Sequence, residues 1–117
     1  MRFVLLVLLM FPLATAAQSI HCALEQGGDE AAMSVRAEPD ALGGTFQEIG
    51  RFKVRAVFAA PPGRTPWLLV EVHARAADGD QRIISSQKVL APFATGRMEV
   101  VEPRMGRMLS YQCGAAQ

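Results

Sequence analysis

The chain has 117 residues, half of them hydrophobic, and its twelve Lys and Arg against eleven Asp and Glu give a formal net charge of +1. This near balance excludes bulk electrostatic binding of nucleic acid, which needs an excess of basic residues on one surface. The length accommodates one domain of about 100 residues behind an N-terminal leader.

Residues 1–17 have the pattern of a secretory signal peptide. One arginine precedes an uncharged apolar run over residues 3–13. A bilayer-spanning helix needs about 20 apolar residues, so this run is too short to remain as an anchor. Small residues at Ala14 and Ala16 suit signal peptidase, and we expect cleavage after residue 16 or 17. The sequence therefore predicts a periplasmic or secreted protein without a membrane anchor after cleavage, with residues 18–117 as a single domain.

The rest of the chain alternates with a period of two, the pattern of β-strands, and turn residues interrupt it at short intervals. Seven strands are expected, over residues 20–25, 33–37, 51–58, 67–75, 82–90, 97–102 and 108–113. This number and spacing predict an all-β fold of about seven short antiparallel strands, in an immunoglobulin-like sandwich or a small barrel.

Two of the expected strands have irregular patterns. The strand at residues 51–58 is expected to extend backward through Phe46 and Ile49, with Gly50 as a bulge, because Ile49 breaks the alternation. Residues 82–90 have mixed polar and apolar side chains on both faces, which is typical of an edge strand or an irregular one.

The two cysteines, Cys22 and Cys113, lie near the two ends of the expected domain. In a small exported domain, two cysteines are most simply joined as one disulfide. Closing so long a loop removes about 4 to 5 kcal/mol of unfolded-state entropy in the loop model. A redox pair or a metal thiolate site would place the cysteines closer together. We therefore expect the first and last strands to lie together.

Three cations on alternate positions, Arg51, Lys53 and Arg55, face one side of their strand at intervals of about 7 Å. We expect them to form a solvated face that pairs with Glu71 on the next strand; the alternative is a recognition strip for an anionic partner. Trp67 and Leu69 also fall on the outward side of that next strand. Together they indicate either a contact patch or side chains covered by a loop.

No catalytic motif stands out. A nucleophilic mechanism needs a base beside its Ser or Cys. His73 lies on a strand next to the one that carries Ser85 and Ser86, but an ordinary surface histidine is the simpler interpretation. No phosphate-binding loop or nucleotide-binding glycine motif is present. We expect neither an active site nor a cofactor.

Methionine thioethers suit Cu(I), and the C-terminal third of the chain contains Met98, Met105 and Met108. The alternative is that these residues fill the core or a contact surface. Taken together, the sequence favours an exported non-enzymatic binding, inhibitor or chaperone-like β module that acts on a protein partner. A periplasmic carrier of copper or another soft metal is the alternative function.

Overall fold

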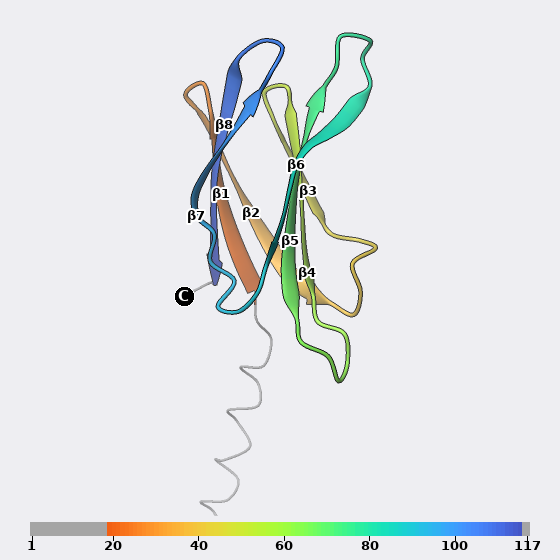
Figure 1. Ribbon diagram of the computed structural model, residues 1–117. Coiled ribbons are helices and arrows are strands. Elements are labelled where there is room, and N and C mark those ends of the chain that lie inside the picture. The colour runs from red at the N-terminus through yellow and green to blue at the C-terminus, as the bar shows by residue number, and fades with distance from the viewer. Residues whose placement is uncertain (1–18, 116–117) are drawn as a thin grey trace, which may run out of the picture.

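The computed structural model describes residues 19–115, and the expected leader lies outside this range. These residues form eight strands (Figure 1), namely β1 (Ser19–Gln26), β2 (Asp29–Glu38), β3 (Thr45–Ile49), β4 (Phe52–Ala59), β5 (Trp67–Arg75), β6 (Gln81–Val89), β7 (Gly96–Glu102) and β8 (Arg107–Ala115). Within residues 19–115 there is no helix that is long and apolar enough to cross a membrane. The expected all-β fold is confirmed.

The strands form two layers joined along one side. Layer A has the order β2-β1-β8-β7, and layer B has the order β3-β4-β5-β6. A short parallel pairing, in which residues 37–38 of β2 lie opposite residues 58–59 of β4, connects the layers into one continuous sheet. The path ends at β6 and β7, which leaves a nearly closed, barrel-like sheet (Figure 1). Every other strand pairing is antiparallel.

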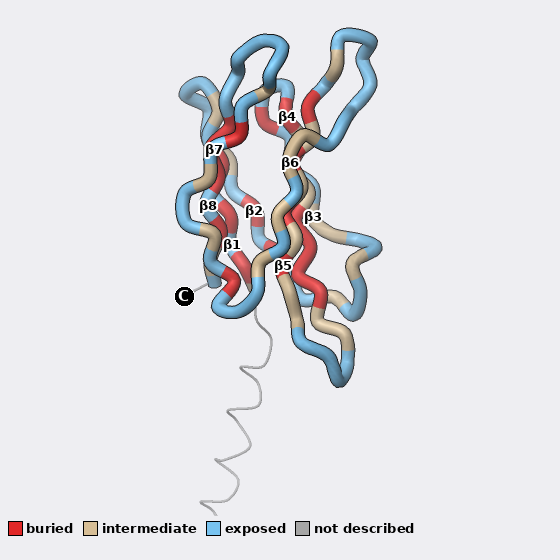
Figure 2. Tube along the Cα trace, viewed as in Figure 1, coloured by how far each residue is buried: buried red, intermediate tan, exposed pale blue. Residues whose placement is uncertain are grey.

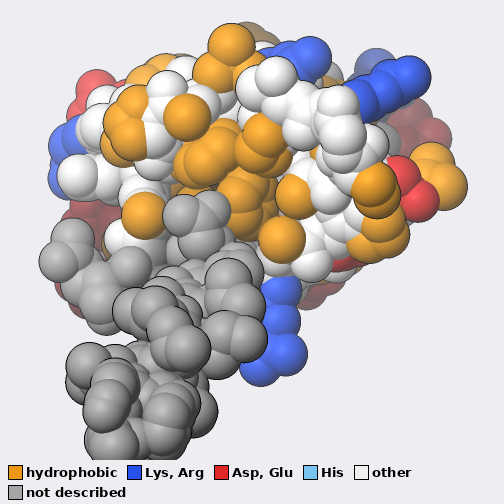
Figure 3. Space-filling model, turned by 90° about the horizontal axis from the view of Figure 1, so that it is seen from below, with side chains coloured by type: hydrophobic (Ala, Val, Ile, Leu, Met, Phe, Trp, Pro, Cys, Tyr) orange, Lys and Arg blue, Asp and Glu red, His pale blue; other side chains and the backbone are white. Residues whose placement is uncertain are grey.

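The space between the two layers is filled with apolar side chains, because apolar and polar residues alternate along the strands. Buried residues alternate with more exposed ones along β1 and β5 (Figure 2), and the buried ones belong to one hydrophobic core cluster. The largest fully buried side chains are those of Tyr111, Phe52, Phe58, Ile20, Leu68 and Leu109. Seen from the end where β1 begins and β8 ends, hydrophobic side chains gather in the middle of the molecule (Figure 3). The two layers therefore share one core.

Cys22 and Cys113 form a disulfide that joins β1 to β8, as expected. The two residues lie directly opposite each other, with their Cα atoms 4.0 Å apart. On its other side, the carbonyl oxygen of Cys113 accepts a hydrogen bond from the backbone N–H of Thr95, and the N–H of Cys113 donates to the side-chain Oγ1 of Thr95, at 3.0 Å each. The cysteines thus occupy a non-hydrogen-bonded position, where facing strands approach most closely.

The predicted backward extension of the 51–58 strand is wrong. Residues 45–49 form a separate strand, β3, which runs antiparallel to β4 with Ile49 opposite Phe52. Gly50 lies in the turn with φ of 59°, a left-handed conformation that glycine adopts easily. The turn brings Ile49 to the same buried face as Phe52, which explains the break in alternation. Residues 19–115 therefore form eight strands, one more than the seven ranges expected.

β6 is an edge strand, as its mixed pattern predicts. Among the strands of residues 19–115 it pairs with β5 alone, and its register shifts between the partners of Val72 and His73. A bulge of this kind hinders another strand from pairing with a free edge.

Candidate functional site

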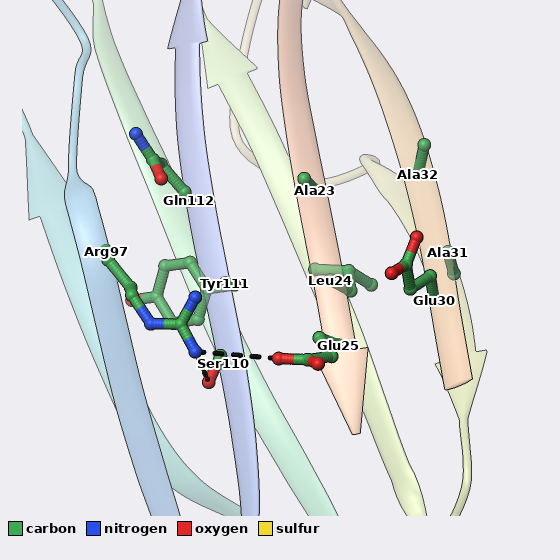
Figure 4. Close-up of a pocket in the computed structure, with 10 residues that line it drawn as sticks. All are labelled: Ala23, Leu24, Glu25, Glu30, Ala31, Ala32, Arg97, Ser110, Tyr111 and Gln112. Atoms are coloured by element: carbon green, nitrogen blue, oxygen red, sulfur yellow. Dashed lines mark hydrogen bonds and ion pairs between the residues drawn. The ribbon is translucent and has the colours of Figure 1, made fainter. Parts of the chain in front are cut away.

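An open groove lies on the outer face of layer A, which no other segment of residues 19–115 covers (Figure 4). Its volume is about 650 Å³. Residues of all four strands line it, namely Ala23, Leu24, Glu25, Glu30, Ala31, Ala32, Arg97, Ser110, Tyr111 and Gln112. We call it the layer A groove. Sequence reasoning did not identify this site.

The hollow arises because two outward positions carry very small side chains. Ala23 and Ala32 lie directly opposite each other on β1 and β2, and both are exposed. Gln112 lies opposite Ala23 on the other side. The hollow continues along the strands toward His21 and Gly114 as a second, shallower depression. A methyl group where a solvated strand usually carries a long polar side chain leaves the backbone accessible from outside.

Arg97 lies across one end of the groove and connects three strands. Its Nη2 atom donates to Oγ of Ser110 at 3.2 Å and to Oε1 of Glu25 at 3.5 Å (Figure 4). Its Nε atom lies 3.9 Å from a carboxylate oxygen of Glu99. Ser110 is only 5% exposed although it faces outward, because the arginine covers it.

The same end of the groove concentrates negative charge. The strand registers place Glu30, Glu25, Ser110 and Glu99 in one row across layer A. We call Glu30, Glu25 and Glu99 the acidic row. Like charges directly opposite each other on a sheet, such as Glu25 and Glu30, destabilise the pairing. Arg97 from the neighbouring row is the cation that offsets this charge.

The predicted basic row lies on the opposite side of the molecule, on the outer face of layer B, and two of its three cations are engaged. Arg55 forms an ion pair with Glu71 at 3.0 Å, and both side chains are mostly buried. The Nζ atom of Lys53 lies 4.8 Å above the ring centre of Phe46. Arg51 is exposed. The expected cross-strand pairing of the row with Glu71 is therefore present.

Arg55 also holds a loop against layer B. It donates to the carbonyl oxygens of Ala41 and Gly43, the latter at 2.9 Å. This brings the next residue, Gly44, so close to Val57 that a Cβ atom at position 44 would lie 2.6 Å from a methyl carbon of Val57. Val57 is fully buried although it faces outward. The outer face of layer B is therefore partly covered, in contrast to that of layer A.

Trp67 and Leu69 face outward from β5, as predicted, and both are half-buried. The Nζ atom of Lys88 lies 4.8 Å from the centre of the Trp67 ring, and Lys88 is also the cross-strand partner of Leu69. The patch is therefore partly shielded by the stem of one lysine.

The three methionines of the soft-metal hypothesis do not converge. Met98 points inward and packs against the core, whereas Met108 points outward beside Val101. Met105 lies in the turn between β7 and β8 and is 62% exposed. Within residues 19–115, no group of three His, Cys, Asp or Glu side chains is placed to hold a metal ion.

His73 contacts a carboxylate rather than a serine. Its Nε2 atom lies 3.5 Å from Oε1 of Glu71 and makes no hydrogen bond to the described part of the chain. Its cross-strand partner is Ile83, while Ser85 lies opposite Val72. The bulge in β6 causes this offset.

The two carboxylates with perturbed pKa values lie in a turn (Asp78) and at the strand end that leads into one (Glu102), away from the groove. Backbone N–H groups of Arg104 and Met105 donate to Glu102 and lower the pKa of its carboxyl group. The backbone N–H of Asp80 has the same effect on the pKa of Asp78. Both interactions stabilise hairpin turns.

Comparison with protein-family models, with curated proteins and with solved structures finds no match to this chain.

Proposed function

We propose that this chain is an exported, non-enzymatic binding module that holds an extended segment of a protein partner in the layer A groove. The observation that carries the proposal is the uncovered floor formed by Ala23 and Ala32 between longer polar side chains. Such a floor lets a polypeptide approach the sheet closely, and polar groups at its margin fix the orientation of what binds there.

The dimensions of the groove suit a short extended segment. Along β1 the two depressions reach from His21 to Glu25, a distance of about 14 Å at the usual rise of a strand. This length accommodates four or five residues of an extended chain. The amide of Gln112 and the guanidinium of Arg97 provide donors at the margin.

The framework behind the groove is rigid. The Cys22–Cys113 disulfide joins the two central strands of layer A directly beneath the floor. A preformed surface loses little conformational entropy on binding, which leaves more of the contact energy as affinity. The disulfide also indicates an oxidising environment outside the cytoplasm. This agrees with the signal peptide expected at residues 1–17 and with a periplasmic or secreted module.

The basic row is the less suitable docking surface. Arg55 is already bound to Glu71 and to two loop carbonyls, and Lys53 rests on Phe46. A partner that recruited these cations would first have to break those contacts. The remaining candidates do not lie together, because Arg51 is beside Arg75 at one end of the β4–β5 pair and Trp67 is opposite Ala59 at the other.

A photocrosslinking amino acid at Ser34, an exposed outward position on β2 beside the groove, tests the proposal in exporting cells. The control carries the same amino acid at Arg64, in the exposed loop between β4 and β5. We expect position 34 to form one discrete cross-linked product that position 64 does not form. Equal products at both positions, or none at position 34, would contradict the proposal.

The partner identified from the cross-linked product is then purified without the cross-link, and its affinity for this protein is measured directly. Ala23→Tyr fills the groove and is expected to weaken binding about tenfold or more, a loss of about 1.4 kcal/mol. The matched surface control is the double variant Arg51→Glu, Lys53→Glu, which reverses the accessible cations of the basic row and spares the structural Arg55. A control that loses affinity while Ala23→Tyr retains it would move the site to layer B.

A further inference from the structure

The acidic row at one end of the layer A groove identifies the chemistry of the occupant. We infer that the docked segment presents a cationic side chain, arginine or lysine, to Glu30 and Glu25. This inference rests on the docking function proposed above and specifies the partner.

The charges in the row do not balance. Three carboxylates, those of Glu30, Glu25 and Glu99, face a single guanidinium, that of Arg97. Glu25 turns toward Arg97, whereas Glu30 reaches over the groove from β2 (Figure 4). No Lys, Arg or His side chain of residues 19–115 lies within ion-pair distance of Glu30. The row therefore has a net negative charge.

The register places this charge where an occupant would meet it. Glu30 and Glu25 are directly opposite residues, so their Cβ atoms are about 5 Å apart. A cation above them reaches both carboxylates. Two residues farther along the same strands are Ala32 and Ala23. An occupant that fits both features has an apolar portion over the alanines and a cation at one end.

The energetics favour the same occupant. In the free protein, Glu25 and Glu30 repel each other across the strand pair. A cation from a partner converts this repulsion into attraction, so the charge contributes to binding and to selection of the partner. Salt screens exposed charges, and the affinity is therefore expected to fall as ionic strength rises.

Synthetic peptides provide a probe that does not require the natural partner. Three acetylated and amidated hexapeptides of alternating Val and Ala, identical except for a terminal Arg, Gln or Glu, are titrated into the protein purified after export. Backbone amide chemical shifts report binding. We expect the Arg peptide to shift resonances at Ala23, Ala32 and Glu30, and to bind about three- to tenfold more tightly than the Gln peptide. The Glu peptide should bind most weakly.

Glu30→Gln tests whether the acidic row causes the preference for the Arg peptide. In this variant the Arg and Gln peptides are expected to bind with nearly equal affinity. The matched control is Glu48→Gln, which removes an exposed carboxylate from β3 on the other layer. The control is expected to retain the full preference for Arg.

The outcomes separate this inference from the docking proposal. Equal binding of all three peptides in the groove would overturn the cationic assignment and leave the docking site in place. Shifts confined to other carboxylates, such as Asp78, would also overturn it. The absence of any shift in the groove with every peptide would contradict both. A change of the same resonances with protein concentration alone would identify a second copy as the occupant and overturn the inference.

Discussion

The phenolic hydroxyl of Tyr111 donates a hydrogen bond to Oε1 of Gln87 at 2.7 Å. Tyr111 lies on β8 in layer A and Gln87 on β6 in layer B, so this bond crosses the interior between the two layers. It lies close to the end of the strand path, where β6 and β7 do not pair with each other. A side chain therefore connects the layers near the side where no backbone ladder does.

Replacing Tyr111 with Phe removes the bond and keeps most of the packing. We expect the free energy of unfolding to fall by about 0.5–1.5 kcal/mol, the usual net value of one hydrogen bond. Urea unfolding followed by the fluorescence of Trp67, the only tryptophan, measures the change. A variant as stable as the wild type would show that the bond does not contribute.

The stability is expected to decline at alkaline pH because burial raises the pKa of Tyr111. Below about pH 10 the phenol is neutral in both the folded and unfolded states. Above that pH the unfolded chain loses the proton first, so the unfolding free energy falls until the pH passes the raised pKa of the folded state. Tyr111 is the only tyrosine, so tyrosinate absorbance reports its titration directly. A midpoint at or below 10 would contradict the expectation.

The double variant Cys22→Ala, Cys113→Ala is expected to lose about 2–5 kcal/mol of stability, since the bond closes a loop over a sequence separation of 91 residues. Urea unfolding of the variant and of the oxidised wild type gives the difference. The reduced wild type serves as a second comparison that preserves the sequence. A loss below about 1 kcal/mol would show that strand pairing alone holds β1 and β8 together.

Arg55→Ala is expected to cost about 1–3 kcal/mol and to expose the loop at residues 39–44, because Arg55 bonds both Glu71 and two carbonyls of that loop. Amide hydrogen exchange should accelerate at residues 42–44. The matched control is Arg51→Ala, an exposed member of the same row, which we expect to change stability by less than about 0.5 kcal/mol. Equal effects of the two substitutions would contradict the role of Arg55 in holding the 39–44 loop.

Local patterns predict the part of the fold that has a single buried face. The alternation of Phe52, Val54 and Ala56 with the charged Lys53 and Arg55 allows one orientation of β4, and that orientation is found. The disulfide is predicted from two cysteines in a small domain that the sequence leads us to expect outside the cytoplasm. The separate strand β3 is harder to predict, because five residues with two apolar positions resemble either a continuation or a new hairpin.

The groove depends on contacts between strands, which sequence order does not give. Ala23 and Ala32 form its floor only because a tight turn places them opposite each other. Ala23 lies at an outward position of the strand expected at residues 20–25. Ala32 lies just before the strand expected at residues 33–37, because β2 begins earlier, at Asp29, than the sequence predicts. The acidic row also requires the pairing of β8 with β1 and β7, which brings Glu99 to the same row as Glu25. The same limit applies to the hold of Arg55 on the 39–44 loop.

The proposed docking of a partner segment on the outer face of layer A underlies the other functional inferences. Backbone amide chemical shifts, recorded while the partner identified by cross-linking is titrated into the protein, test this docking site. Every backbone amide of both layers is observed in the same experiment. We expect perturbations centred on Ala23, Ala32 and Gln112, which line the groove. Perturbations centred instead on Lys53, Trp67 and Leu69 would contradict it.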